Sequence, residues 1–158
     1  MNYKASTTVN EPKAVKRRLL VKSILLAIVI VMCLPLLRTP TDFTRDNRSE
    51  WRYGEFLYEG KITPDTYAVF FTWYDGQFTC DLVRHEWLRY EYMDTIFGDW
   101  PGRNWRVNRD FESQGKVYNI TYGFLPEGSA RSNDEGITYI ETDYGGALYF
   151  TVTEKSPA

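Results

Sequence analysis

Few residues in this chain are able to carry out nucleophilic or acid–base chemistry. The 158 residues include one histidine, His85, and two cysteines, Cys33 and Cys80. Cys80 and His85 are residue types that form nucleophile–base pairs, but no neighbouring residue is marked as the third group that would orient the imidazole. One histidine, with one cysteine outside the apolar N-terminal segment, is too little for a His/Cys metal cluster. The sequence therefore predicts no metal site and no cofactor.

Carboxylates are the remaining candidates for catalysis. Four of them lie close together in the sequence: Glu86, Glu91, Asp94 and Asp99. Two carboxylates across a groove are sufficient for glycoside hydrolysis, yet acidic residues in such a segment usually form a solvated face. Glycine-rich phosphate loops and the G-x-S-x-G elbow do not occur in the sequence. We therefore expect no enzyme activity, with a carboxylate-based hydrolase as the minor alternative.

Aromatic residues are the most unusual feature of the chain. Every aromatic residue except Tyr3 lies after residue 38. The segment 99–105 reads Asp-Trp-Pro-Gly-Arg-Asn-Trp, which places two tryptophans and an arginine around a turn. Because Trp and Arg are enriched at binding hot spots and turns lie at surfaces, we expect a contact site at Trp100, Arg103 and Trp105. Anchoring of these rings in the core is the alternative.

The charge of the chain limits its partners. Residues 38–158 contain 13 Lys and Arg against 20 Asp and Glu, a net charge of −7. Such a surface repels the phosphate groups of nucleic acids, so no nucleic-acid partner is expected. A protein partner is expected instead, and a glycan held by exposed rings and carboxylates is the alternative.

An apolar segment lies near the N-terminus. Residues 19–37 contain one charged residue, Lys22, and a helix of this length spans about 28 Å, close to the hydrocarbon thickness of a bilayer. We therefore expect a transmembrane helix at 19–37. It would be a signal anchor rather than a cleaved signal peptide, a lipoprotein anchor at Cys33 or a buried core helix. The basic tail, residues 1–18, predicts a cytoplasmic N-terminus, which would make residues 38–158 periplasmic or extracellular.

The rest of the chain predicts a polar stalk at 38–50 and one β-rich domain at 51–158. Alternating apolar and polar residues favour strands, and Asp75-Gly76 is typical of a tight hairpin. The expected strands are residues 55–61, 66–74, 77–83, 104–110, 116–122, 137–142 and 147–153. Residues 84–97 carry apolar side chains at three- and four-residue steps, which predicts a helix. We therefore expect an α+β fold, an antiparallel sheet with one helix, with an all-β sandwich or barrel as the alternative.

Three details depend on the expected strands. Phe70 and Phe71 are adjacent, so their rings must lie on opposite faces of one strand, and the sheet must be covered on both sides or meet a partner. Cys80 falls at an apolar position of an alternating run, which favours a buried thiol, with an intermolecular disulfide as the alternative. The triplets that begin at Asn47 and Asn119 match the N-glycosylation pattern, and the sequence leaves their use open.

Few catalytic groups, many rings and an expected tether favour a binding function. The sequence predicts a single-pass, membrane-tethered binding module that acts through protein–protein contact in the cell envelope or at the cell surface. It would be an accessory subunit of a membrane complex or an inhibitor. A glycan-binding domain is the first alternative, and the carboxylate-based hydrolase is the second.

Overall fold

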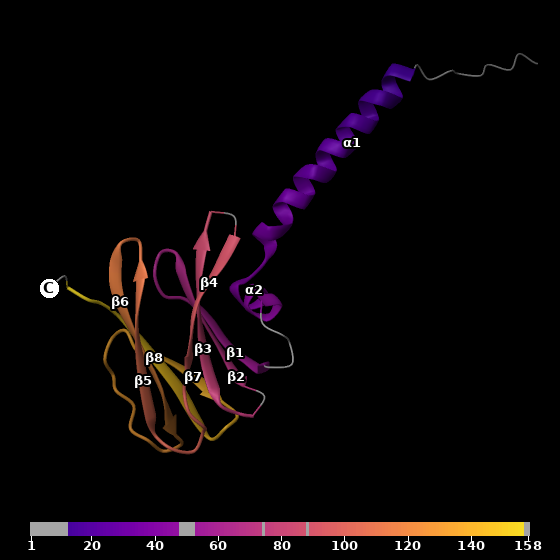
Figure 1. Ribbon diagram of the computed structural model, residues 1–158. Coiled ribbons are helices and arrows are strands. Elements are labelled where there is room, and N and C mark those ends of the chain that lie inside the picture. Colours follow the sequence, from indigo (N-terminus) through magenta and orange to yellow (C-terminus); the bar gives the residue numbers. More distant parts are fainter. Residues whose placement is uncertain (1–12, 48–52, 74, 88, 157–158) are drawn as a thin grey trace, which may run out of the picture. The chain divides into compact units, whose positions relative to one another are not determined.

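The chain divides into two compact units, residues 1–37 and residues 38–158. The computed structural model describes residues 13–47, 53–73, 75–87 and 89–156 (Figure 1). The first unit contains helix α1 (Lys13–Cys33) and a 3₁₀ turn, η1 (Leu34–Leu37). The second unit contains helix α2 (Pro40–Asn47) and, in its described residues, eight strands. The strands are β1 (Tyr53–Lys61), β2 (Thr66–Trp73), β3 (Phe78–Glu86), β4 (Arg89–Phe97), β5 (Trp105–Ser113), β6 (Lys116–Pro126), β7 (Thr138–Thr142) and β8 (Gly146–Glu154).

Helix α1 is not the membrane-crossing helix that the apolar segment predicts. Within the described residues, none of the helices is long and apolar enough to pass through a membrane. The helix ends at Cys33, and basic residues extend through its N-terminal half as far as Lys22. Its uncharged part, residues 23–33, is therefore about 16 Å long, roughly half the hydrocarbon thickness of a bilayer.

Three predictions about the N-terminal segment are therefore wrong. They are the transmembrane helix at 19–37, its role as a signal anchor, and the single-pass localisation that placed residues 38–158 in the periplasm or outside the cell. Residues 1–12, which form most of the expected basic tail, lie outside the described residues.

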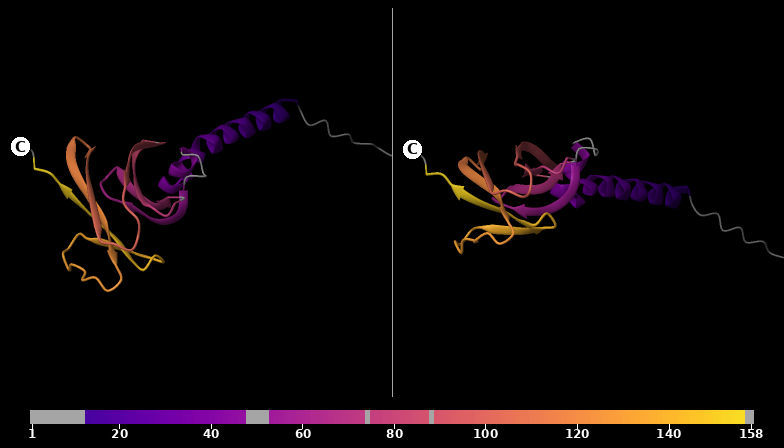
Figure 2. Two further views of the ribbon diagram at one scale, coloured as in Figure 1. Left: turned by 60° about the horizontal axis from the view of Figure 1, so that its bottom comes forward. Right: turned by 90° about the horizontal axis from the view of Figure 1, so that it is seen from below.

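Residues 38–158 form a mostly β unit of two antiparallel sheets, so the predicted α+β class is wrong. Each sheet has four strands, in the orders β1-β2-β3-β4 and β5-β6-β8-β7. Figures 1 and 2 show the two sheets facing each other, with the chain passing from one sheet to the other after β4. Of the two architectures expected from the sequence, the all-β alternative is nearer to this arrangement.

The segment expected to form a helix, residues 84–97, is the end of β3 and the whole of β4. Trp87 turns the chain between the two strands with a left-handed φ of 55°. The β3–β4 pairing then slips between Leu82 and Val83, which leaves Met93 without an opposite residue. Tyr90 packs against the cluster on the outer face of sheet β1–β4, whereas Met93 packs against the main core. Strand β4 therefore carries apolar side chains on both faces, and their three-residue spacing resembles that of a helix.

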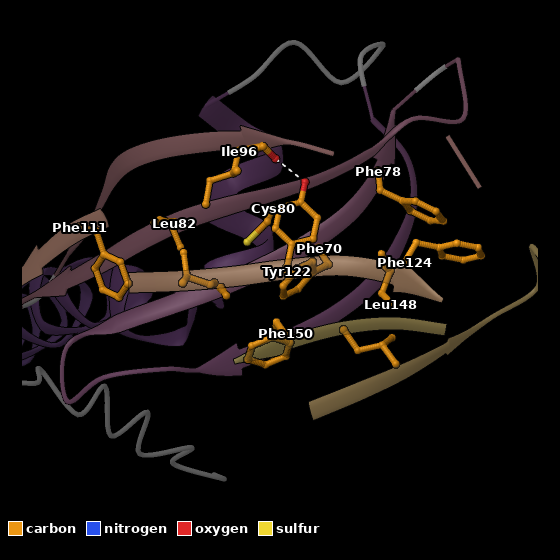
Figure 3. Close-up of a cluster of buried hydrophobic side chains, with 13 residues drawn as sticks. Phe70, Phe78, Cys80, Leu82, Ile96, Phe111, Tyr122, Phe124, Leu148 and Phe150 are labelled. Carbon is orange, nitrogen blue, oxygen red and sulfur yellow. Dashed lines mark hydrogen bonds between the residues drawn. The ribbon is translucent and has the colours of Figure 1, made fainter. Parts of the chain in front are cut away.

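The main core lies between the two sheets and is rich in rings. Phe78 and Phe124, from opposite sheets, stack with their ring centroids 5.4 Å apart. The buried hydroxyl of Tyr122 on β6 donates a hydrogen bond of 2.8 Å to the carbonyl oxygen of Ile96 on β4, as Figure 3 shows. The fully buried or nearly buried members of the core are Ala68, Phe70, Phe78, Cys80, Leu82, Ile96, Phe111, Ile120, Tyr122, Phe124, Ile140, Leu148 and Phe150.

Helix α2 covers the outer face of sheet β1–β4. Val69, Phe71 and Val83 are buried on this face, and Phe43 of α2 packs against them. Strand β2 therefore buries side chains on both faces, which resolves the open question about the adjacent rings of Phe70 and Phe71 in favour of a covered sheet.

The sequence of α2 explains why a helix forms in the segment expected to be a stalk. Thr39 is the N-cap: its hydroxyl accepts from the amide of Asp42 at 3.1 Å, and the Asp42 carboxylate accepts from the amide of Thr39 at 3.2 Å. Pro40 occupies the first helical position, where it needs no hydrogen bond. The helix is held to β1 because the amide and hydroxyl of Thr41 donate to Glu59 at 2.9 and 2.6 Å. Residues 48–50 of the expected stalk lie outside the described residues.

Candidate binding surface at the β4–β5 loop

The loop between β4 and β5, residues 98–104, holds Trp100 and Arg103, and Trp105, the third contact residue that the sequence predicts, begins β5. The amide of Gly98 donates to the carbonyl of Phe78 at 2.9 Å, and the amide of Phe78 donates to the carbonyl of Asp99 at 3.3 Å. Gly98 has no room for a side chain, because a Cβ there would lie 2.4 Å from the ring of Trp105. The loop is therefore fixed against the start of β3 rather than projecting freely.

Trp100 lies on the surface of this loop. Its side chain is 47% exposed, and the ring lies over the β2–β3 hairpin, 3.4 Å from where a Cβ on Gly76 would be. Its backbone carbonyl accepts a hydrogen bond of 3.1 Å from the indole nitrogen of Trp105, and its amide donates one of 2.8 Å to the carboxylate of Asp99. The ring therefore has a defined position while it keeps about half of its area open to a partner.

Arg103 and Asp99 form an ion pair beside Trp100, in which the guanidinium donates to the carboxylate. The hydrogen bond from the amide of Trp100 lowers the pKa of Asp99, and the hydrogen bond from Arg103 lowers it further. The Arg103 side chain is otherwise exposed. The ion pair therefore restricts the directions that Arg103 can take without removing it from the surface.

Trp105, the third predicted contact residue, faces the interior. Its ring packs against Tyr122 at a centroid distance of 5.3 Å and against Phe78 at 6.2 Å. It is one of the partly buried residues that line the main core. The structure thus brings the three residues together but separates them by role: Trp100 and Arg103 lie at the surface, and Trp105 anchors the loop to the core.

Other rings extend this surface across the end of sheet β1–β4. Phe97, at the end of β4, is 49% exposed and meets Trp73 edge-on at 5.6 Å. Phe56 on β1 is 38% exposed and packs edge-on against Phe71 at 5.8 Å. We refer to Phe56, Trp73, Phe97, Trp100 and Arg103 together as the aromatic end of the sheet.

Trp87 is a second exposed tryptophan, and sequence reasoning missed it. It lies at the tip of the β3–β4 hairpin and is 94% exposed. Its left-handed backbone conformation is one that bulky residues rarely adopt. The expected helix concealed it, because there it counted as one member of the apolar stripe. It lies at the opposite end of β4 from Trp100, about 30 Å along the strand, so the two tryptophans belong to different surfaces.

The candidate catalytic groups are not brought together. Cys80 lies in the main core, whereas the ring of His85 packs against Tyr90, 4.8 Å away on the outer face of the same sheet. Residues five apart in a strand point to opposite faces, so the two side chains are separated by the sheet.

The four candidate carboxylates each lie near an arginine, and Glu86 and Glu91 share the same one. Glu86 and Glu91 lie 3.6 and 4.0 Å from Arg84, and Asp94 lies 3.1 Å from Arg109. Asp99 pairs with Arg103 as described above. Among the described residues, no group of three or more His, Cys, Asp and Glu side chains is placed to hold a metal ion.

The thiol of Cys80 is expected to be unreactive in the folded chain. It is fully buried, which confirms the interpretation from alternation, and burial raises its pKa well above 9.0, with the charges of Asp81 and Asp94 adding to the effect. A Cys33→Ser chain should therefore resist an aromatic disulfide reagent until urea unfolds it. The matched Cys80→Ser chain should react at once, because Cys33 is exposed. Fast labelling of native Cys80, or a Cys80-linked dimer, would contradict the buried position.

In comparisons with known proteins, no protein-family model, no curated protein and no solved structure matches the chain.

Proposed function

We propose that this chain is a protein-binding module and that the aromatic end of sheet β1–β4 is its contact surface. The observation that carries the proposal is the half-exposed ring of Trp100, held in place beside Arg103 on a loop that is bonded to β3. A large ring left in water gains free energy when a partner covers it, and Trp and Arg are both enriched at binding hot spots.

Fixed geometry supports this role. Binding costs less when the contacting side chains already hold their bound positions. The ring of Trp100 rests on the Gly76 turn, and Arg103 is held by Asp99. A partner that covers Trp100 and Phe97 would also desolvate the Arg103–Asp99 pair, which favours a partner able to add a hydrogen-bond acceptor for the guanidinium.

The excess of acidic groups also bears on the class of partner. The net charge of −7 over residues 38–158 disfavours nucleic acids as partners. Aromatic residues and arginine, which make up the aromatic end of the sheet, are enriched at protein interfaces.

The proposal is tested with a Trp100→Ala/Arg103→Ala double variant of the full chain. Wild-type chain on a support captures a partner from an extract of the cells that express it, and mass spectrometry quantifies recovery. We expect the double variant to lose more than about tenfold of the affinity for the purified captured protein. Its stability should change by less than about 1 kcal/mol, because both side chains are surface groups and the Trp100 carbonyl that Trp105 uses remains.

Two matched variants control the experiment. Arg106→Ala removes an exposed arginine of β5 outside the aromatic end and should leave the partner's affinity unchanged. Trp105→Ala removes a ring that contacts the core and should lower the melting temperature. Unchanged affinity in the double variant, or a loss of stability in it as large as that of Trp105→Ala, would reject the aromatic end as the contact surface.

A further inference from the structure

Most of the large apolar side chains that the structure shows as exposed lie in one segment, residues 19–37. Their exposed fractions run from 49% to 78%. At about half exposure each, they leave on the order of 1,000 Å² of apolar surface in water, whereas each partner of a standard protein interface contributes about 800 Å². A patch of this size marks an interaction site, and it belongs to a different unit of the chain from the aromatic end of the sheet.

One face of α1 has an open depression with the layout that receives a side chain of another helix. It has a volume of about 320 Å³ and is lined by Ile24, Ala27, Ile28, Val31 and Met32. The first four of these residues stand at positions i, i+3, i+4 and i+7 of the helix. In coiled coils, four residues in this arrangement form the hole that accepts one side chain of the facing helix. The depression therefore fits a second apolar helix.

The face that carries the depression is also an apolar seam. Leu20, Ile24, Ala27 and Val31 follow one another at steps of four, three and four residues, the spacing of a coiled-coil seam. Lys22 precedes Ala27 by five residues, about 140° around the helix, so it lies on another face. The seam combines large side chains with the small Ala27, and it is therefore complementary to a second copy of itself.

The charges of α1 determine the direction in which two copies can pair. The helix has five basic residues and no acidic residue, and all five precede Ser23. Parallel helices would hold these basic halves side by side, where they repel each other. Antiparallel helices place each basic half beside the C-terminal end of the other helix. The carbonyl groups at that end carry partial negative charge, and α1 has no basic residue of its own in its last turn.

We propose that α1 is a self-association helix through which two copies of this chain pair in antiparallel orientation. A twofold axis between Ile24 and Ala27 places Ile24 opposite Ala27 of the second copy, and Leu20 opposite Val31 of the second copy. Each copy then fills the depression of the other with the same side chain. The pair is held together because the apolar side chains of both seams leave water.

Sedimentation equilibrium of the full chain between about 1 and 100 µM tests the pairing, with a monomer–dimer equilibrium as the expected result. Ile24→Glu/Val31→Glu places carboxylates in the seam and should weaken the dimer by more than about tenfold. Leu25→Glu/Val29→Glu is the matched control. It adds the same charges at side chains of similar exposure on the opposite face of α1, and it should leave the dimer affinity unchanged.

Disulfide formation tests the direction of the helices. In a Cys33→Ser background, Leu20→Cys and Val31→Cys chains should form a mixed disulfide when they are combined. Each should form little disulfide alone, because the two copies of position 20 lie about 16 Å apart along an antiparallel pair. The remaining thiol, Cys80, is buried and does not interfere.

The proposal is overturned if the chain stays monomeric up to about 100 µM, including the case in which lipid vesicles or another protein cover α1 instead. It is also overturned if both glutamate double variants weaken association equally, which would indicate non-specific aggregation. Efficient cross-linking of each cysteine variant with itself would overturn the antiparallel arrangement and the proposal with it.

Discussion

Replacing Tyr122 by alanine is expected to lower the free energy of unfolding by about 3–5 kcal/mol, the largest effect of any single change considered. The side chain is fully buried, and its ring meets Phe70 at 5.5 Å and Trp105 at 5.3 Å. Its hydroxyl also joins the two sheets through the carbonyl of Ile96. Alanine would therefore leave a ring-sized cavity between the sheets as well as an unpaired carbonyl.

A Tyr122→Phe variant divides this loss into its two parts. It keeps the ring and removes only the hydrogen bond to Ile96, so we expect it to cost about 1 kcal/mol. Burial raises the pKa of Tyr122 well above 10.0, and the charges of Cys80 and Asp81 add to this, so the hydroxyl remains a donor.

Urea unfolding followed by tryptophan fluorescence measures the two variants against Val117→Ala, a change at an exposed position that should cost less than about 0.5 kcal/mol. If Tyr122→Ala lost no more stability than Tyr122→Phe, the ring would not be part of the core.

The second large effect is expected at Asp65, whose carboxylate links the two sheets. One of its oxygens accepts from the hydroxyls of Thr63 at 3.1 Å, Thr66 at 3.0 Å and Ser113. Thr63 and Asp65 lie in the β1–β2 connection, Thr66 begins β2 and Ser113 ends β5. The hydroxyl oxygens of Thr63 and Ser113 are 2.7 Å apart. We expect Asp65→Ala to cost about 2–3 kcal/mol, because it leaves buried hydroxyls without their charged acceptor.

The same carboxylate predicts a dependence of stability on pH. Burial by itself raises the pKa of Asp65, but the hydrogen bonds from Ser113, Thr66 and Thr63, with the charge of Arg84, outweigh it and lower the pKa below 3.8. A folded-state pKa below the unfolded value means that the stabilisation is complete above about pH 4 and is lost as pH falls through the folded-state pKa.

Urea midpoints measured from neutral pH down to about pH 3 should therefore fall more steeply for the wild type than for Asp65→Asn, which cannot titrate. Asp134→Asn, at an exposed position in the β6–β7 loop, is the matched control and should keep the steep profile. Parallel profiles for the wild type and Asp65→Asn would show that Asp65 does not contribute to acid sensitivity.

Local patterns in the sequence were sufficient to locate most strands. Alternation marked the segment around Phe70 and Phe71, and the structure confirms that both of its faces are buried. Asp75-Gly76 marked the β2–β3 hairpin, where Gly76 adopts the positive φ of 90° that the turn requires. Such signals are read within a few residues, so they need no knowledge of what packs against the strand.

The failures of sequence reasoning have physical causes that can be named. In β4 apolar residues lie on both faces, with Tyr90 on the outer face and Met93 at the main core, and their three-residue spacing was mistaken for that of a helix. In the expected stalk, α2 forms because Thr39 and Asp42 cap it and because Phe43 finds an apolar face on a distant sheet. In the apolar segment, hydropathy predicted one helix that continues to residue 37, whereas α1 ends at Cys33.

At the candidate site, too, the sequence located the residues but not the contacts that they make. The sequence identified a turn rich in Trp and Arg, but it could not separate the surface residue Trp100 from the anchoring residue Trp105, because both flank the same Pro-Gly turn. Their roles follow from contacts made elsewhere: Trp105 packs against Tyr122 on another strand, whereas the ring of Trp100 lies over the Gly76 turn and is 47% exposed. Trp87 escaped notice because its exposure depends on a hairpin that the sequence did not predict.

The sequence by itself thus determined where most strands of this protein lie and favoured a buried Cys80, since side-chain alternation is imposed by the backbone of each strand separately. Only the tertiary structure decided which strands share a sheet, which face α2 covers, and which groups meet across the core. The link between Asp65 and Ser113 joins residues 48 positions apart, and the bond from Tyr122 to Ile96 joins residues 26 apart. Contacts of this kind depend on how the two sheets close upon each other, a property that no short segment carries.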